Sequence, residues 1–127
     1  MNSVNLEELY SLQAKLDKEI ADNHHVSYKS THDKRLLALI VEIGELANET
    51  RCFKYWSNKG PSAKEIVMDE FADGLHFLLS LGIPLEAKKF VYEIKEQKEE
   101  LTLQIHKLYK QVIALQKHYN LRTYEKA

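Results

Sequence analysis

Apolar residues recur at steps of three and four along most of this chain, which is the spacing of one face of an α-helix. The first such stretch runs from about Asn5 to Ala21, with apolar side chains at Leu6, Leu9, Leu12, Leu16 and Ile20. Three further helical stretches are predicted: about Lys34 to Trp56, about Ala63 to Leu81, and Leu85 to about Tyr119. The last of these is one bent helix or two.

Residues that start and end helices separate these stretches. Lys59-Gly60-Pro61-Ser62 breaks the chain, and Ser62 with Glu65 three residues later predicts a capping box for the third helix. Gly82-Ile83-Pro84 ends that helix. With only four glycines and two prolines, the chain has little turn chemistry for a β-sandwich or barrel. We therefore predict a single all-α domain over residues 1–127, folded as an antiparallel helical bundle.

Charge and cysteine content exclude several classes of protein. The net charge of −1 provides no basic stripe for a nucleic acid polymer. Cys52 is the only cysteine, so one chain can form neither a disulfide framework nor a cysteine-based zinc site. The N-terminus lacks the basic and apolar regions of a signal peptide, and no apolar run is long enough to span a membrane. We expect a cytoplasmic protein with no membrane partner.

Acidic residues fall inside the two most apolar stretches, and their spacing is informative. Glu42, Glu45 and Glu49 lie on a strip about 60° wide, which borders the apolar face of their helix. Glu70 and Asp73 repeat the arrangement one turn apart on the next helix. If the two strips face each other, the carboxylates surround one small volume and need cations to stay ionised. Ligands that are all oxygen suit Mg²⁺ or Mn²⁺.

A solvated helix face is the competing interpretation of either acidic pair, since acids are mostly exposed in proteins. The pairing favours a metal site, because both strips lie in stretches that otherwise read as buried. Glu49 fits either the acidic strip or an ion pair with Arg51 or Lys54 at the end of its helix.

These residues resemble the signature of the dimeric all-α deoxyuridine triphosphatases (dUTPases), within the superfamily of MazG-like pyrophosphohydrolases. The superfamily carries E-x-x-E on one helix and E-x-x-D on the next, here Glu42-Ile-Gly-Glu45 and Glu70-Phe-Ala-Asp73. Three segments are similar to the dUTPase branch: Leu12-Gln13-Ala14-Lys15-Leu16-Asp17, the aromatic and basic segment Phe53 to Lys59, and Asp73 to Leu81. The resemblance is good over roughly Asn5 to Leu81 and looser to Leu108.

The resemblance implies Mg²⁺-dependent hydrolysis of dUTP to dUMP and pyrophosphate by a homodimer. It makes Glu42, Glu45, Glu70 and Asp73 the metal ligands, with Glu42 and Glu45 catalytic and Glu42 our choice for activating the water. It makes Gln13 the reader of the uracil edge, while Trp56 and Phe77 wall the base. Lys54 and Lys59 are candidates to meet the phosphates, and His76 lies beside the acidic face. Taken singly, these aromatics and this histidine are more often core, and these lysines more often solvated.

The end of the chain departs from the family, and two other functions compete. Family members usually continue into a further helix and a tail with Asn, Lys and Arg that closes over the phosphates, whereas here no such motif precedes Ala127. We therefore expect a domain that is short at its C-terminus, with its full activity in question. One alternative is a pyrophosphohydrolase acting on other or non-canonical nucleotides. The other is a non-catalytic helical interaction module, with a coiled-coil arm over Glu86 to Tyr119.

Overall fold

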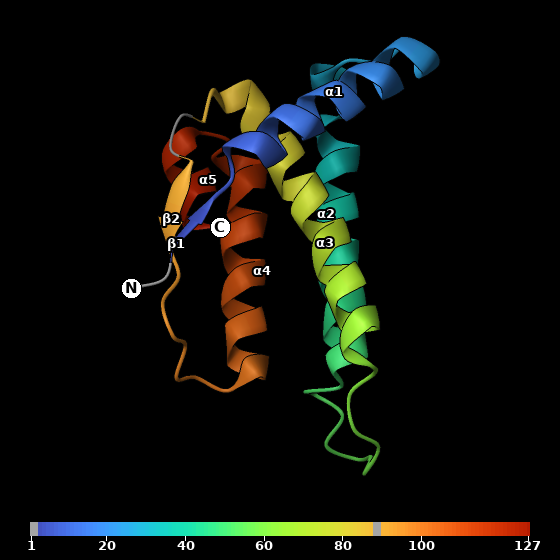
Figure 1. Cartoon of the computed structure of the whole chain (residues 1–127), viewed down its shortest axis with the longest axis vertical. Coiled ribbons are helices and arrows are strands. Elements are labelled where there is room, and N and C mark those ends of the chain that lie inside the picture. The colour runs from blue at the N-terminus through green and yellow to red at the C-terminus, as the bar shows by residue number, and fades with distance from the viewer. Residues whose placement is uncertain (1–2, 88–89) are drawn as a thin grey trace.

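The computed structural model describes residues 3–87 and 90–127 and confirms the predicted all-α fold (Figure 1). The helices of the described residues are α1 (Glu7–His24), α2 (Tyr28–Thr50), α3 (Lys64–Gly82), α4 (Leu101–Lys117) and α5 (Leu121–Lys126), with a short 3-10 helix η1 (Ile83–Leu85). Two three-residue strands, β1 (Ser3–Asn5) and β2 (Val91–Glu93), form the small sheet. No helix in the described ranges is long and apolar enough to cross a membrane.

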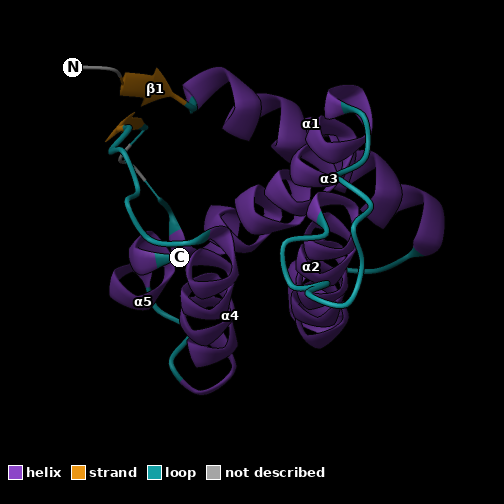
Figure 2. Ribbon diagram, turned by 90° about the horizontal axis from the view of Figure 1, so that it is seen from below, coloured by secondary structure: helices purple, strands orange, loops and turns teal. Residues whose placement is uncertain are grey.

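Helices α2 and α3 run antiparallel at the centre of the molecule, and α4 runs antiparallel to α2 (Figure 1). In the perpendicular view, α1 lies on the side of α3 and α4 on the side of α2 (Figure 2). The core follows one stripe of α2 that packs against α4. Its buried residues are Leu36, Leu39, Ile43 and Ala47 from α2, Ile105, Val112 and Leu115 from α4, Leu81 from α3 and Tyr124 from α5. Burying this stripe leaves another side of α2, which carries its glutamates, to face α3.

Helix α2 begins and ends earlier than the predicted Lys34 to Trp56. Polar residues cap both of its ends, and apolar periodicity does not detect them. Ser27 caps the start, since its Oγ accepts from the Ser30 amide at 3.1 Å and its own amide donates to Ser30 Oγ at 2.8 Å. The first two turns of the helix are mostly polar, so periodicity did not reveal them. The helix ends where Arg51 adopts a left-handed φ of 57° and its amide donates to the Ala47 carbonyl at 3.0 Å.

The predicted capping box at the start of α3 is wrong. Ala63 occupies the cap position and makes no side-chain cap hydrogen bond. Ser62 instead donates a short hydrogen bond from Oγ to Glu49 Oε2, which ties the loop back to α2. The Ser62 hydroxyl therefore bonds to Glu49 of α2 instead of capping α3.

The prediction of one helical stretch from Leu85 to about Tyr119 is wrong in its first part. Of the described residues there, 91–93 form β2 and 94–100 contain no helix, while residues 88 and 89 lie outside the described residues. Val91 pairs with Asn5 in the antiparallel register, and the Leu6 amide donates to the Phe90 carbonyl at 2.8 Å. The charged run 95–100 has no apolar face to bury, so helix resumes only at Leu101. A continuous coiled-coil arm from Glu86 to Tyr119 is therefore also wrong.

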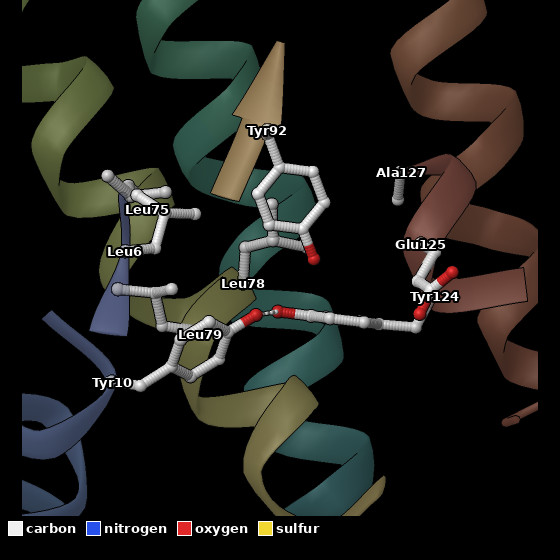
Figure 3. Close-up of a pocket in the computed structure, with 9 residues that line it drawn as sticks. All are labelled: Leu6, Tyr10, Leu75, Leu78, Leu79, Tyr92, Tyr124, Glu125 and Ala127. Carbon is white, nitrogen blue, oxygen red and sulfur yellow. Dashed lines mark hydrogen bonds between the residues drawn. The ribbon is translucent and has the colours of Figure 1, made fainter. Parts of the chain in front are cut away.

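Tyr124 fastens α5 to the rest of the molecule. Its side chain is 4% exposed, and its hydroxyl lies 2.7 Å from the Tyr10 hydroxyl of α1 across a cavity of about 180 Å³ (Figure 3). Its ring packs so closely on Gly82 of α3 that a Cβ at that position would overlap the ring atoms. None of the acidic residues of α2 or α3 lines this cavity.

Candidate active site

The antiparallel pairing of α2 and α3 brings three of the four predicted carboxylates together. Glu42 and Glu45 project from α2 and Glu70 from α3, and one oxygen of each lies within 4.8 Å of the others. The i, i+3 spacing places the two α2 glutamates on one strip, and the neighbouring helix supplies the third. Asp73 is exposed and lies outside this group of three, but it is near enough to act on Glu42 electrostatically.

This acidic cluster (Glu42, Glu45 and Glu70) carries uncompensated charge. Burial, followed by repulsion from Glu45 and Asp73, raises the pKa of Glu42 to about 7. Burial and Glu45 also raise the pKa of Glu70. The Oε2 atoms of Glu42 and Glu70 are buried and find no hydrogen-bond partner among the described residues.

A divalent cation fits this donor set. Carboxylate oxygens are the ligands that Mg²⁺ and Mn²⁺ prefer, and the two buried, unpartnered oxygens are what such an ion would satisfy. No lysine or arginine forms an ion pair with the cluster in the described part of the chain, where the ion pair within 4 Å joins Lys107 to Glu99. The cluster can therefore accept positive charge from outside the protein.

A cavity of about 690 Å³ lies between α1, the start of α2 and the end of α3. Three of the predicted substrate-binding residues line it: Gln13, His76 and Phe77. The Gln13 side chain is only 5% exposed, and its Oε1 lies 2.7 Å from Nδ1 of His76. Its Nε2 donates to Asp17 Oδ1 at 2.9 Å. The cavity wall is otherwise largely apolar, as in pockets that bind a flat organic group.

Sequence analysis missed a polar group at one side of this cavity. Arg35 donates from Nη1 to the Ser80 carbonyl at 3.0 Å and to its Oγ at 3.1 Å, and from Nη2 to the Tyr28 carbonyl at 2.9 Å. The guanidinium carbon lies 4.9 Å from the centre of the Tyr28 ring. Burial lowers the pKa of Arg35. Arg35 directly precedes the apolar run of α2, which could have drawn attention to it. Its partner Ser80 is 45 residues away, so the sequence did not indicate this contact.

The aromatic and basic segment lies away from this cavity. Trp56, Lys54 and Lys59 belong to the loop between α2 and α3, which Figure 1 shows in green at the end of the helix pair opposite α1. Trp56 is 64% exposed and packs edge-on against Tyr55, with ring centres 5.2 Å apart. Lys54 Nζ lies 5.8 Å from the centre of the Phe53 ring. Within one chain, the structure does not bring these residues to Gln13.

The acidic strip also ends earlier than its sequence spacing allows. Glu49 accepts from Ser62 rather than joining the cluster or pairing with Arg51 or Lys54. Arg51 instead donates to Ser57 Oγ at 2.8 Å and to the Lys59 carbonyl at 3.2 Å. These bonds hold the loop at the end of α2, one turn beyond Glu45.

A sequence model of the dUTPase family matches residues 5–127 of this chain. The match extends well beyond the first 81 residues, which carry the clearest motifs, and includes α4 and α5. Searches of the curated proteins and of the solved structures found no match.

Proposed function

Because the chain belongs to the all-α dUTPase family, we propose that it hydrolyses dUTP to dUMP and pyrophosphate with Mg²⁺ as cofactor. The observation that carries the proposal is the acidic cluster, where three carboxylates converge and two of their oxygens lack partners. The cavity that holds Gln13 and His76 lies between the same two helices and α1, and His76 follows Asp73 by one helical turn, which supports placing the base there.

Glu42, Glu45, Glu70 and Asp73 are the proposed ligands, with Mn²⁺ a possible substitute for Mg²⁺. An ion held by these carboxylates would neutralise charge on the phosphate oxygens and would lower the pKa of a coordinated water. Asp73 is exposed and near enough to raise the pKa of Glu42 electrostatically, so it would be the most solvent-accessible of the four ligands. More than one ion is consistent with four carboxylates.

Glu42 is the proposed group that takes the proton of the attacking water, with Glu45 supporting it. In the metal-free chain the pKa of Glu42 is raised to about 7, and a bound cation would lower it, so that the carboxylate would be ionised and able to accept a proton at neutral pH. The charge of Glu45 contributes to that raised pKa, so the two glutamates act as one unit.

Gln13 is the proposed reader of the base, and Phe77 the proposed aromatic wall. Phe77 lines the cavity and also packs on the core, which fixes its ring. His76 contacts the substrate-binding region through its bond to Gln13. Trp56, Lys54 and Lys59 belong to the loop at the end of the α2–α3 pair opposite α1, so in this proposal the loop of a second chain would bring them to the base.

A homodimer is part of this proposal. Helix α1 presents an apolar stripe in which Leu9, Leu12, Leu16 and Ile20 are each between 38% and 53% exposed. Leu16 and Ile20 also line the large cavity. Four large apolar residues in register on one helix favour burial against another apolar surface. Sedimentation should give a dimer at micromolar concentration, and a monomer there would contradict this part of the proposal.

The test is to incubate the purified chain with dUTP, dCTP, dTTP and UTP, with and without Mg²⁺, and to separate the products. We expect dUMP and pyrophosphate from dUTP alone, and only with metal. Hydrolysis of all four nucleotides would move the function to the broader superfamily. Glu45→Gln is the matched loss-of-function variant, and near-normal turnover by it would refute the metal site.

A further inference from the structure

A chain of hydrogen bonds leads away from Gln13 through three helices. Gln13 donates from Nε2 to Asp17 Oδ1 at 2.9 Å, and the Tyr28 hydroxyl donates to Asp17 Oδ2 at 2.9 Å. Arg35 lies over the Tyr28 ring and interacts electrostatically with Asp17. At the other end, His76 approaches Gln13 Oε1 at 2.7 Å. The Gln13 amide is therefore held at both of its ends inside the protein.

We propose that Asp17 is a specificity-determining positioning residue, which fixes the polarity of the Gln13 amide and so selects a uracil edge over a cytosine edge. This inference rests on the proposed function, because it assumes that the cavity beside Gln13 receives the base of a nucleotide. The inference adds to the proposed function the residue, Asp17, that determines which base the enzyme accepts.

The two neighbours of the Gln13 amide differ in the hydrogen bonds that they can make. A carboxylate only accepts hydrogen bonds, so it requires the nitrogen end of the amide to face Asp17. An imidazole nitrogen donates or accepts according to its tautomer, so His76 can adapt to either end of the amide. If the amide turned over, Asp17 would face an oxygen and lose its bond, whereas His76 could change tautomer. Asp17 is therefore the neighbour that decides.

The polarity of the amide matters because uracil and cytosine present opposite patterns. Uracil offers a donor at N3 and an acceptor at O4, while cytosine offers an acceptor at N3 and a donor at N4. Gln13 keeps a second N–H and a second oxygen lone pair after its internal bonds are made. In one base position, an amide of fixed polarity matches one of these edges and opposes the other.

Asp17 is itself held in place, so its carboxylate cannot move to follow a rotation of the Gln13 amide. Tyr28 holds the second carboxylate oxygen, and Arg35 holds the Tyr28 carbonyl while bonding to Ser80. Ser80 is 1% exposed and belongs to α3, which also carries His76. The frame that orients Gln13 thus closes on the helix that carries the rest of the site.

The test variant is Asp17→Asn, which keeps the shape but can present either an oxygen or an amino group to Gln13. We expect the ratio of kcat/KM for dUTP to that for dCTP to fall by about 10- to 100-fold, the worth of one hydrogen bond to a charged group. The loss should appear mainly in KM. Asp17→Glu keeps a group that only accepts, and should retain the preference for dUTP at a reduced kcat/KM. Asp22→Asn, the same change at an exposed position of α1, should leave the ratio unchanged.

A merely structural role for Asp17 would lower the melting temperature and both kcat/KM values together, without changing their ratio. An unchanged ratio in Asp17→Asn would therefore overturn the inference and leave the proposed function standing. Calorimetric binding of dUMP and dCMP tests the inference without turnover. If wild type hydrolysed no nucleotide but preferred dUMP, and Asp17→Asn lost that preference, the proposed function would fail and the inference would hold. If wild type bound neither monophosphate, the inference would fail.

Discussion

Replacing Glu42 by glutamine should stabilise the metal-free protein while it abolishes activity. Glutamine has the same shape as glutamate but carries no charge. It therefore avoids the repulsion that Glu45, Asp73 and Glu70 exert on the Glu42 carboxylate. Since the pKa of Glu42 is about 7 in the folded chain against an ordinary 4.5, folding favours its protonated form. Its contribution to stability is full below pH 4.5, is lost as pH rises through 7, and stays lost above that.

The size of the effect follows from the same shift. A rise from 4.5 to about 7 corresponds to an upper limit of about 3 kcal/mol in the free energy of unfolding. Glu42 is only half-buried and Glu45 is exposed, so solvent screening reduces the expected gain to about 1 kcal/mol. For a domain of this size, that is about 3–5 °C in Tm.

The assay is thermal unfolding of wild type and Glu42→Gln in EDTA, at pH 5 and pH 8. The variant should exceed wild type at pH 8, and the difference should shrink at pH 5. Glu19→Gln, at an exposed position of α1, is the control that changes the same charge without the cluster. Added Mg²⁺ should then raise the Tm of wild type more than that of Glu42→Gln. The reasoning is refuted if metal-free Glu42→Gln is less stable than wild type at pH 8, or if its advantage is the same at both pH values.

Three other outcomes are expected. Calorimetric Mg²⁺ affinity should weaken about tenfold from pH 8 to pH 6, because an ion must displace the proton of a Glu42 whose pKa is about 7, and an affinity independent of pH would contradict the site. Gly82→Ala should cost about 1–3 kcal/mol in urea unfolding, because its Cβ overlaps the Tyr124 ring; unchanged stability would show that α5 packs elsewhere. Tyr124→Phe should cost about 1 kcal/mol by losing its bond to Tyr10, measured in the same way, with Tyr55→Phe in the exposed loop as the neutral control.

Local spacing was enough to predict α1, α3 and most of α2 and α4, and to single out the acidic residues. Glu42 and Glu45 share a strip because they are one turn apart, and that relation depends on nothing outside their helix. The apolar stripe of α2 likewise showed which side would be buried. Apolar periodicity failed where the spacing of apolar residues is compatible with both helix and strand. The spacing of Val91 and Ile94 predicted helix, but Val91 pairs with Asn5 in a strand.

The all-α class and the carboxylate strips follow from the sequence alone, because both depend on contacts within one or two turns of a helix. Three other features come from tertiary packing: Glu70 joins Glu42 and Glu45, Ser62 bonds to Glu49, and the Trp56 loop lies away from Gln13. Packing alone brought His76, 63 residues from Gln13 in the sequence, to the Gln13 amide, whereas Asp17 lies one turn from Gln13 on the same helix. Such contacts depend on how helices rotate and slide against one another, and packing of the whole core sets that, not the spacing along any one helix.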